Sequence, residues 1–122
     1  PYVCMKNFMA VFTGSPTSDA RRQWDRLDEQ ERKQRQVAGM KAWQEWVAKH
    51  QAIIVDGGAP LGKTKRICRD GIADTRNNLA AYVVVRAESQ EAAARLFESH
   101  PHFSIFPGDA VEVMECLPVP GR

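Results

Sequence analysis

The sequence is poor in cysteine. Its 122 residues include three, Cys4, Cys68 and Cys116, which lie far apart and form no C-x-x-C pair. An odd number at this spacing favours neither a disulfide framework nor a zinc site. We therefore expect buried thiols in a reducing cytosol, and we predict no metal and no cofactor.

Long hydrophobic runs and an excess of one charge are also absent. No segment approaches the roughly 18 to 20 apolar residues of a membrane helix, and we expect no signal peptide because the first residues lack its basic-then-apolar pattern. Its 17 basic and 15 acidic residues give a net charge of +2 and are spread along the sequence. Nucleic-acid binders usually concentrate basic residues on one face. The expectation is a cytoplasmic protein without nucleic-acid or membrane partners.

Two segments carry helical signals. From Asp19 the chain favours a helix, and Asp28 with Glu31 resembles a capping box that restarts or continues it. A stripe of apolar residues at three- and four-residue spacing then predicts packing against a sheet, and we expect it to contribute most to the core: Val37, Met40, Trp43, Trp46 and Val47. Ser89 offers an N-cap to a second helix that we expect to end near His100, because Pro101 disfavours helix there.

The remaining signals are those of strands. Residues 5–13 are apolar on both alternating sets, and residues 79–87 are rich in β-branched side chains. Shorter strands are predicted over 52–55, where Asp56-Gly57-Gly58 marks a turn, and over 110–117. A further strand is expected over 65–72, returning beside residues 52–55, and a loop over 74–78.

This order predicts one domain, residues 1–122, with the ferredoxin-like β-α-β-β-α-β sandwich of the α+β class. Both helices then cover one face of a four-stranded sheet. Strands that are apolar on two sides need a second cover, and another copy of the chain is the economical source. The predicted partner is therefore the chain itself, as a homodimer.

The glycine-rich segment from Gly57 to Thr64 formally matches the G-x-x-x-x-G-K-[ST] phosphate-binding loop. That loop works because a helix begins at its Lys-Thr pair and directs backbone amides to the phosphates. The residues after Lys63 lack helical periodicity and include Gly71. We interpret the segment as a turn between strands, with nucleotide binding as the alternative.

His102 is the candidate of most interest among three histidines, with His50 expected at a helix C-terminus and His100 on a helix face. Pro101 and Pro107 bracket a segment that combines the His102 imidazole and a hydroxyl with aromatic rings, as ligand pockets often do. A surface imidazole on a packed loop is the alternative. Metal binding by His100 and His102 would need a third ligand, such as Asp109 or Glu112. Glu112 and Glu115 fall on opposite faces of one strand and so make no acid-base pair.

Three segments resemble the carboxyl half of the YCII-related family, in the branch of the DGPF-domain proteins: Ala81 to Ala93, His100-Pro101-His102-Phe103, and Pro107-Gly108-Asp109-Ala110-Val111-Glu112-Val113. The first strand and the segment Val55 to Gly62 are similar too, although Asp-Gly-Pro-Phe itself is absent. The resemblance implies a dimeric α+β barrel with a cleft beside the sheet, where a histidine and an aspartate act.

Under this resemblance His102 corresponds to the histidine of the family's Pro-His pair, and Asp56 or Asp109 is our hypothesis for its partner. These three residues are the candidate catalytic set. The predicted function is that of a small-molecule-binding protein or minor enzyme using general acid-base chemistry at His102. A non-catalytic dimerisation or regulatory module and a nucleotide-binding protein are the alternatives.

Overall fold

The structure is a computed structural model that describes residues 4–121. Its elements follow in chain order: β1 (Lys6–Thr13), α1 (Asp19–Arg26), α2 (Glu29–Lys49), a 3-10 turn (Gln51–Ile53), β2 (Ile54–Pro60), β3 (Thr64–Cys68), β4 (Gly71–Thr75), β5 (Leu79–Ala87), α3 (Gln90–Arg95), α4 (Pro101–Ser104) and β6 (Ala110–Glu115). The mixture of helices and an antiparallel sheet confirms the predicted α+β class.

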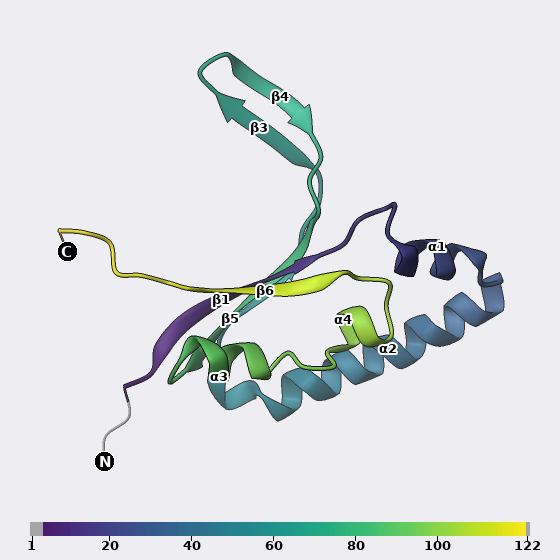
Figure 1. Cartoon of the computed structure of the whole chain (residues 1–122), viewed down its shortest axis with the longest axis horizontal. Helices are drawn as coiled ribbons and strands as arrows, with labels where there is room; N and C mark the ends of the chain where they lie inside the picture. Colours follow the sequence, from purple (N-terminus) through teal and green to yellow (C-terminus); the bar gives the residue numbers. More distant parts are fainter. Residues whose placement is uncertain (1–3, 122) are drawn as a thin grey trace.

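Four strands form the main sheet in the order β2-β5-β1-β6, and every neighbouring pair is antiparallel. With the β3–β4 hairpin set aside as an insertion, this is the strand order of a ferredoxin-like fold. Phe8 pairs with Val85 on one side and with Glu115 on the other. Figure 1 shows α2, α3 and α4 on one side of this sheet.

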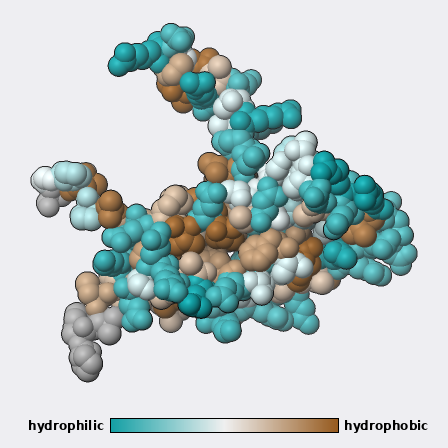
Figure 2. Space-filling view, viewed as in Figure 1, coloured by the Kyte–Doolittle hydropathy of each residue, from teal (hydrophilic) through white to brown (hydrophobic). Residues whose placement is uncertain are grey.

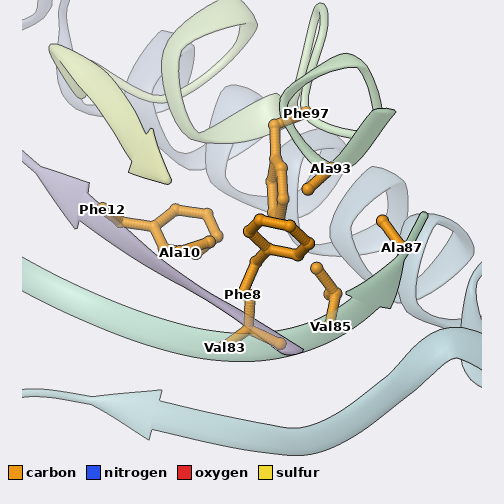
Figure 3. Packing of buried hydrophobic residues seen from close by; sticks show 8 residues of the cluster. All are labelled: Phe8, Ala10, Phe12, Val83, Val85, Ala87, Ala93 and Phe97. Atoms are coloured by element: carbon orange, nitrogen blue, oxygen red, sulfur yellow. The ribbon is translucent and has the colours of Figure 1, made fainter. Parts of the chain in front are cut away.

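The core lies between the sheet and the helices. Its buried residues come mainly from β1, β5 and the α3 region (Figure 3): Phe8, Ala10, Phe12, Val83, Val85, Ala87, Ala93 and Phe97. Burial of apolar surface of this kind stabilises the fold by about 25 cal/mol per Å². The expectation that the long helix contributes most is wrong. Only Trp43 and Trp46 of its stripe pack on this cluster, and Val37, Met40 and Val47 are exposed.

Local capping explains where the helices begin. The Asp28 carboxylate accepts from the Glu31 backbone amide at 2.8 Å, and the Glu31 side chain accepts from the Asp28 amide, so the predicted capping box is present and restarts the helix. Ser89 caps α3 as predicted, by accepting from Ala92 N at 3.1 Å. The helix α3 ends at Arg95, earlier than the expected end near His100, and the chain forms a separate short helix, α4, from Pro101.

The segment expected to turn at Asp56-Gly57-Gly58 continues instead as strand β2 to Pro60. Its pairing with β5 is irregular on both sides of Asp56, which marks β-bulges. Gly58 has φ +68°, and a Cβ there would lie 1.7 Å from the carbonyl oxygen of Tyr82. The glycine therefore serves a bulge against β5 rather than a turn between hairpin strands.

The chain between β2 and β5 forms a projecting arm, the β3–β4 hairpin. β3 pairs with β4 and not with β2, so the predicted return of residues 65–72 beside 52–55 is wrong, and only the end of β4, residues 74–75, lies where a loop was predicted. The paired Ile67 and Ile72 are 71% and 70% exposed. In Figure 1 the arm leaves the sheet on the side opposite the helices.

The three cysteines are exposed, so the expectation of buried thiols is wrong. Cys68 lies in the arm and Cys116 just beyond β6, where no core covers the chain. Among residues 4–121, no helix is long and apolar enough to cross a membrane.

The sheet face turned away from the helices carries a second apolar set. Side chains alternate between the faces of a strand, so the burial of Phe8, Ala10 and Phe12 directs Met9 and Val11 outward. Cross-strand pairing places Val84 and Met114 on the same face as Met9. Figure 2 shows hydrophobic surface in the middle of the molecule and on the arm, with mostly hydrophilic surface over α1.

Candidate functional site

His102 lies in α4 and is 8% exposed, so the alternative of a surface imidazole on a packed loop is wrong. Pro101 occupies the first turn of this helix, where its missing N–H costs nothing. The His100 Nδ1 accepts a hydrogen bond from the His102 backbone amide at 3.0 Å and so caps the helix. The two histidines are therefore one structural unit, in which His100 holds the start of the turn that carries His102.

The His102 ring has a defined tautomer. Its Nε2 lies 2.7 Å from the carbonyl oxygen of Thr13, at the end of β1. A carbonyl oxygen can only accept, so Nε2 carries the proton and donates it. The same oxygen accepts from the Asp109 amide at 2.9 Å. The His102 Nδ1 is then the unprotonated nitrogen, and it makes no hydrogen bond within residues 4–121.

Gly108 is close to this ring. A Cβ at Gly108 would lie 2.3 Å from His102 Nε2 and 2.5 Å from its carbonyl oxygen. Its amide donates to that carbonyl at 2.9 Å. The glycine is therefore part of the site, because any side chain would collide with the imidazole.

Asp109 is the predicted carboxylate that the structure brings near His102. Its Oδ2 accepts from the Ser15 backbone amide at 2.9 Å, which fixes the β1–α1 loop, and it does not bond the imidazole directly. Burial lowers the pKa of His102 below its usual value, and the hydrogen bond to Thr13 and the charge of Asp109 partly oppose this. The imidazole is therefore neutral at pH 7 and available as a base.

Asp56 lies elsewhere. It pairs with Val84, which places it on the sheet face turned away from the helices and from α4. Its carboxylate accepts from the Gly58 amide at 2.8 Å and so supports the bulge of β2. The structure does not bring Asp56 and His102 together.

His100 occupies an aromatic cage and is 1% exposed. Its Nδ1 accepts a hydrogen bond, so Nε2 carries the proton, and within residues 4–121 that atom has no polar partner. The ring of Trp43 stands at 90° to it with 4.6 Å between centroids, an arrangement that suits a weak N–H···π contact. Burial, with smaller contributions from the charges of His102 and His50, lowers the pKa of His100 to about 4. His100 is a neutral core residue.

His102 borders a cleft of about 520 Å³, within the usual range for small-molecule sites. The cleft lies between the loop after β1, the helix α1 and the turn that follows α4. Its lining combines apolar side chains with an imidazole, a hydroxyl and one ion pair: Gly14, Ser15, Pro16, Arg21, Asp25, Ala80, His102, Phe106, Pro107 and Gly108.

The Phe106 wall of this cleft is fixed from behind. A Cβ at Gly39 of α2 would lie 2.5 Å from the Phe106 ring, so this buried glycine allows the aromatic ring to rest directly on the helix backbone. The centroid of the Trp24 ring lies 6.1 Å from the centroid of the Phe106 ring. Sequence analysis missed Arg21, Asp25 and Gly39, because only the tertiary packing of α1 and α2 brings them to the site.

Metal binding was one alternative for His100 and His102. In residues 4–121 no group of three or more His, Cys, Asp or Glu side chains could hold a metal ion. His100 Nδ1 is already used in capping α4.

After Lys63 the strand β3 begins at Thr64, which confirms that no helix follows the glycine-rich segment. His50 ends α2 as predicted, and its Nδ1 donates to the Trp46 carbonyl at 2.8 Å.

The fold and this cleft define a ferredoxin-like α+β protein with a histidine-bearing cleft at one end of the sheet. One solved structure with this fold is 5-chloro-2-hydroxyhydroquinone dehydrochlorinase (TftG) from Burkholderia phenoliruptrix AC1100, in complex with 2,5-dihydroxybenzoquinone. The likeness covers 88% of this chain and 90% of that one, with a TM-score of 0.52 and 16% sequence identity. At this identity it shows the shared fold alone. No family model and no curated protein matches the sequence.

Proposed function

We propose that this protein binds a small organic molecule in the His102 cleft and that His102 exchanges a proton with it. The single observation that carries the proposal is the fixed tautomer of His102 at the wall of a 520 Å³ cleft. Nε2–H is occupied by the Thr13 carbonyl, so the other nitrogen remains as a base that no protein group uses.

The proton transfer would proceed through Nδ1. An acidic O–H or C–H of the bound molecule gives its proton to Nδ1, and the electron pair stays on the molecule. The resulting imidazolium keeps its Nε2–H on the Thr13 carbonyl, and the nearby Asp109 charge favours the cation. The reverse step returns the proton, which is the general acid-base chemistry of an isomerase, lyase or hydrolase.

Two similarities support this proposal. The segments around His102 and Asp109 resemble the YCII-related family, and we propose that the chain is a divergent member of it. The structural neighbour with the same fold is named as a dehydrochlorinase and is bound to 2,5-dihydroxybenzoquinone, a small ring compound. Both favour a small-molecule site over a phosphate loop at Lys63, where a strand stands in place of the required helix.

We also propose that a second copy of the chain covers the open sheet face. Met9 and Met114 are exposed there, and Met9 pairs with Val84 of β5 on one side and with Met114 of β6 on the other. A two-fold dimer would bury the same apolar patch of both copies at once. The β3–β4 arm rises on that side of the sheet, so it would flank the partner (Figure 1). This surface also favours the alternative function of a dimerisation module.

The test of the site combines histidine NMR with calorimetry. The probes are 2,5-dihydroxybenzoquinone, benzoate and resorcinol, each a six-membered ring that the cleft can hold. Binding of at least one probe should shift the His102 ring signals, and His102→Asn should abolish the binding heat. His50→Asn, in which the substituted residue is at the C-terminus of α2, should bind like the original protein.

Folding of the variants is checked by circular dichroism, because His102 is buried and packs on Phe12 at 5.2 Å between ring centroids. If no probe moves the His102 signals, or if a folded His102→Asn variant binds unchanged, the proposed site is wrong.

A further inference from the structure

Arg21 brings a positive charge to the His102 cleft. It lies in the first turns of α1, whose N-cap Ser18 accepts from the Arg21 amide at 3.1 Å. Its Nε is 3.2 Å from Oδ1 of Asp25, one turn further along the helix, and both side chains line the cleft. Within residues 4–121 its two terminal nitrogens have no hydrogen bond or ion pair.

The ion pair with Asp25 orients Arg21 without using all of its donors. Asp25 engages the Nε edge of the guanidinium and leaves the edge formed by Nη1 and Nη2 free. That edge presents two roughly parallel N–H donors, which match the two oxygens of a carboxylate or the adjacent oxygens of an enolate. An arginine anchored in this way loses less side-chain entropy when it binds an anion.

The neighbouring Arg22 is a natural contrast. It pairs with Asp19 through a terminal nitrogen, so the edge that Arg21 keeps free is used in Arg22. Arg22 is also outside the lining of the cleft. The two arginines share a helix, a charge and a high exposure, and they differ in whether they reach the site.

We infer that the cleft takes a small organic anion, whose charged oxygens bind the Nη edge of Arg21 while its exchangeable proton faces His102 Nδ1. This inference rests on the proposed function and names the class of ligand. Phe106, Pro107 and Pro16 supply apolar walls for the body of the molecule. Loss of a proton makes the bound anion more negative, and Arg21 together with the imidazolium offsets that charge.

Calorimetry with three probes at pH 7.5 and low salt tests the inference. 2,5-Dihydroxybenzoquinone presents enolate oxygens, benzoate presents a carboxylate, and resorcinol is an uncharged ring of similar size. At least one anion should bind more tightly than resorcinol. Arg21→Gln should weaken binding of that anion at least tenfold, since it removes charged hydrogen-bond donors to the anion's oxygens. Which anion shows the effect distinguishes an enolate site from a carboxylate site.

Arg22→Gln is the matched control and should leave binding unchanged. Both substitutions remove one exposed helix ion pair, so neither should alter the fold, as the melting temperature will report. The inference is overturned if resorcinol binds as tightly as the anions, or if the two variants weaken binding equally through loss of net charge. In either case a shifted His102 signal would leave the proposed proton exchange standing, whereas an unshifted signal for every probe rejects the proposed function itself.

Discussion

Gly108 and the His102 ring are packed so closely that a single added methyl group would lie 2.3 Å from the imidazole Nε2. The amide of Gly108 also donates to the His102 carbonyl, so the backbone cannot move away without losing that bond. The glycine therefore fixes the position of the imidazole against Thr13.

Gly108→Ala is expected to displace the His102 ring and to break its hydrogen bond to Thr13. Overpacking of this kind costs about 1–3 kcal/mol. The free energy of unfolding in urea measures that cost, and the His102 ring signals in NMR report the displacement. Gly62→Ala is the control, because nothing lies within 4 Å of a Cβ there. Equal stability of the two variants would mean that the ring yields freely and that Gly108 does not hold it.

The buried His100 predicts a loss of stability in mild acid. Its folded pKa is about 4, against about 6.5 in the unfolded chain. As pH falls from 6.5 to 4, the unfolded chain gains a proton that the folded protein does not, so stability decreases, by up to about 3 kcal/mol. The lowered pKa of His102 acts in the same direction. Urea unfolding at pH 7, 6 and 5 measures the slope, above the range in which most carboxylates titrate.

The control for this slope is His100→Asn. Asparagine can keep the cap on α4 by accepting from the His102 amide, but it does not titrate in this range. The variant should be less stable at pH 7, because the aromatic cage loses a ring, and its stability should depend less on pH between 6.5 and 5. An unchanged slope would assign the acid sensitivity to other groups.

The periodicity of the sequence was sufficient to predict the main helices and strands. It was not sufficient to predict which strands pair with each other. β1, β5 and the capping box at Asp28 are local patterns, and each is present. Whether β3 pairs with β2 or with β4 depends on the geometry of the Gly58 bulge and of the tight turn at Gly71. Alternation alone does not specify that choice.

The candidate site was predicted in part for the same reason. His102 stands out by residue type, and Asp109 is seven residues further along a short connection, so their proximity is nearly local. Asp56 carries the same carboxylate group as Asp109. It lies on the other face of the sheet, because the bulge of β2 sets its register with Val84. Arg21 comes from a helix some 80 residues before His102, and only the packing of α1 brings it to the cleft.

The glycine-rich segment from Gly57 to Thr64 is predicted not to bind nucleotides. Gly57 and Gly58 lie within β2, and Lys63 precedes a strand, so no helix N-terminus faces the place where phosphates would lie. Addition of magnesium and ATP should leave the melting temperature unchanged. A saturable increase that Lys63→Ala abolishes would contradict this and would restore the nucleotide-binding alternative.

The open sheet face predicts a homodimer whose stability depends on Val84. Light scattering at micromolar concentration should give twice the mass of the 13.7 kDa chain. Val84→Glu places a carboxylate beside Met9, and at a buried interface it would have no partner. We expect a folded protein whose dimer dissociation constant rises roughly a hundredfold, which corresponds to about 3 kcal/mol.

The control is Val37→Glu. Val37 is 67% exposed on α2, on the helix side of the sheet, so the same charge introduced there should leave the dimer intact. Val83 is unsuitable as a control because it is buried in the core of the chain and a glutamate there would unfold the protein. A single-chain mass for the original protein at micromolar concentration would reject the dimer. If Val84→Glu leaves the dimer unchanged and Val37→Glu dissociates it, the interface lies on the exposed side of α2 instead.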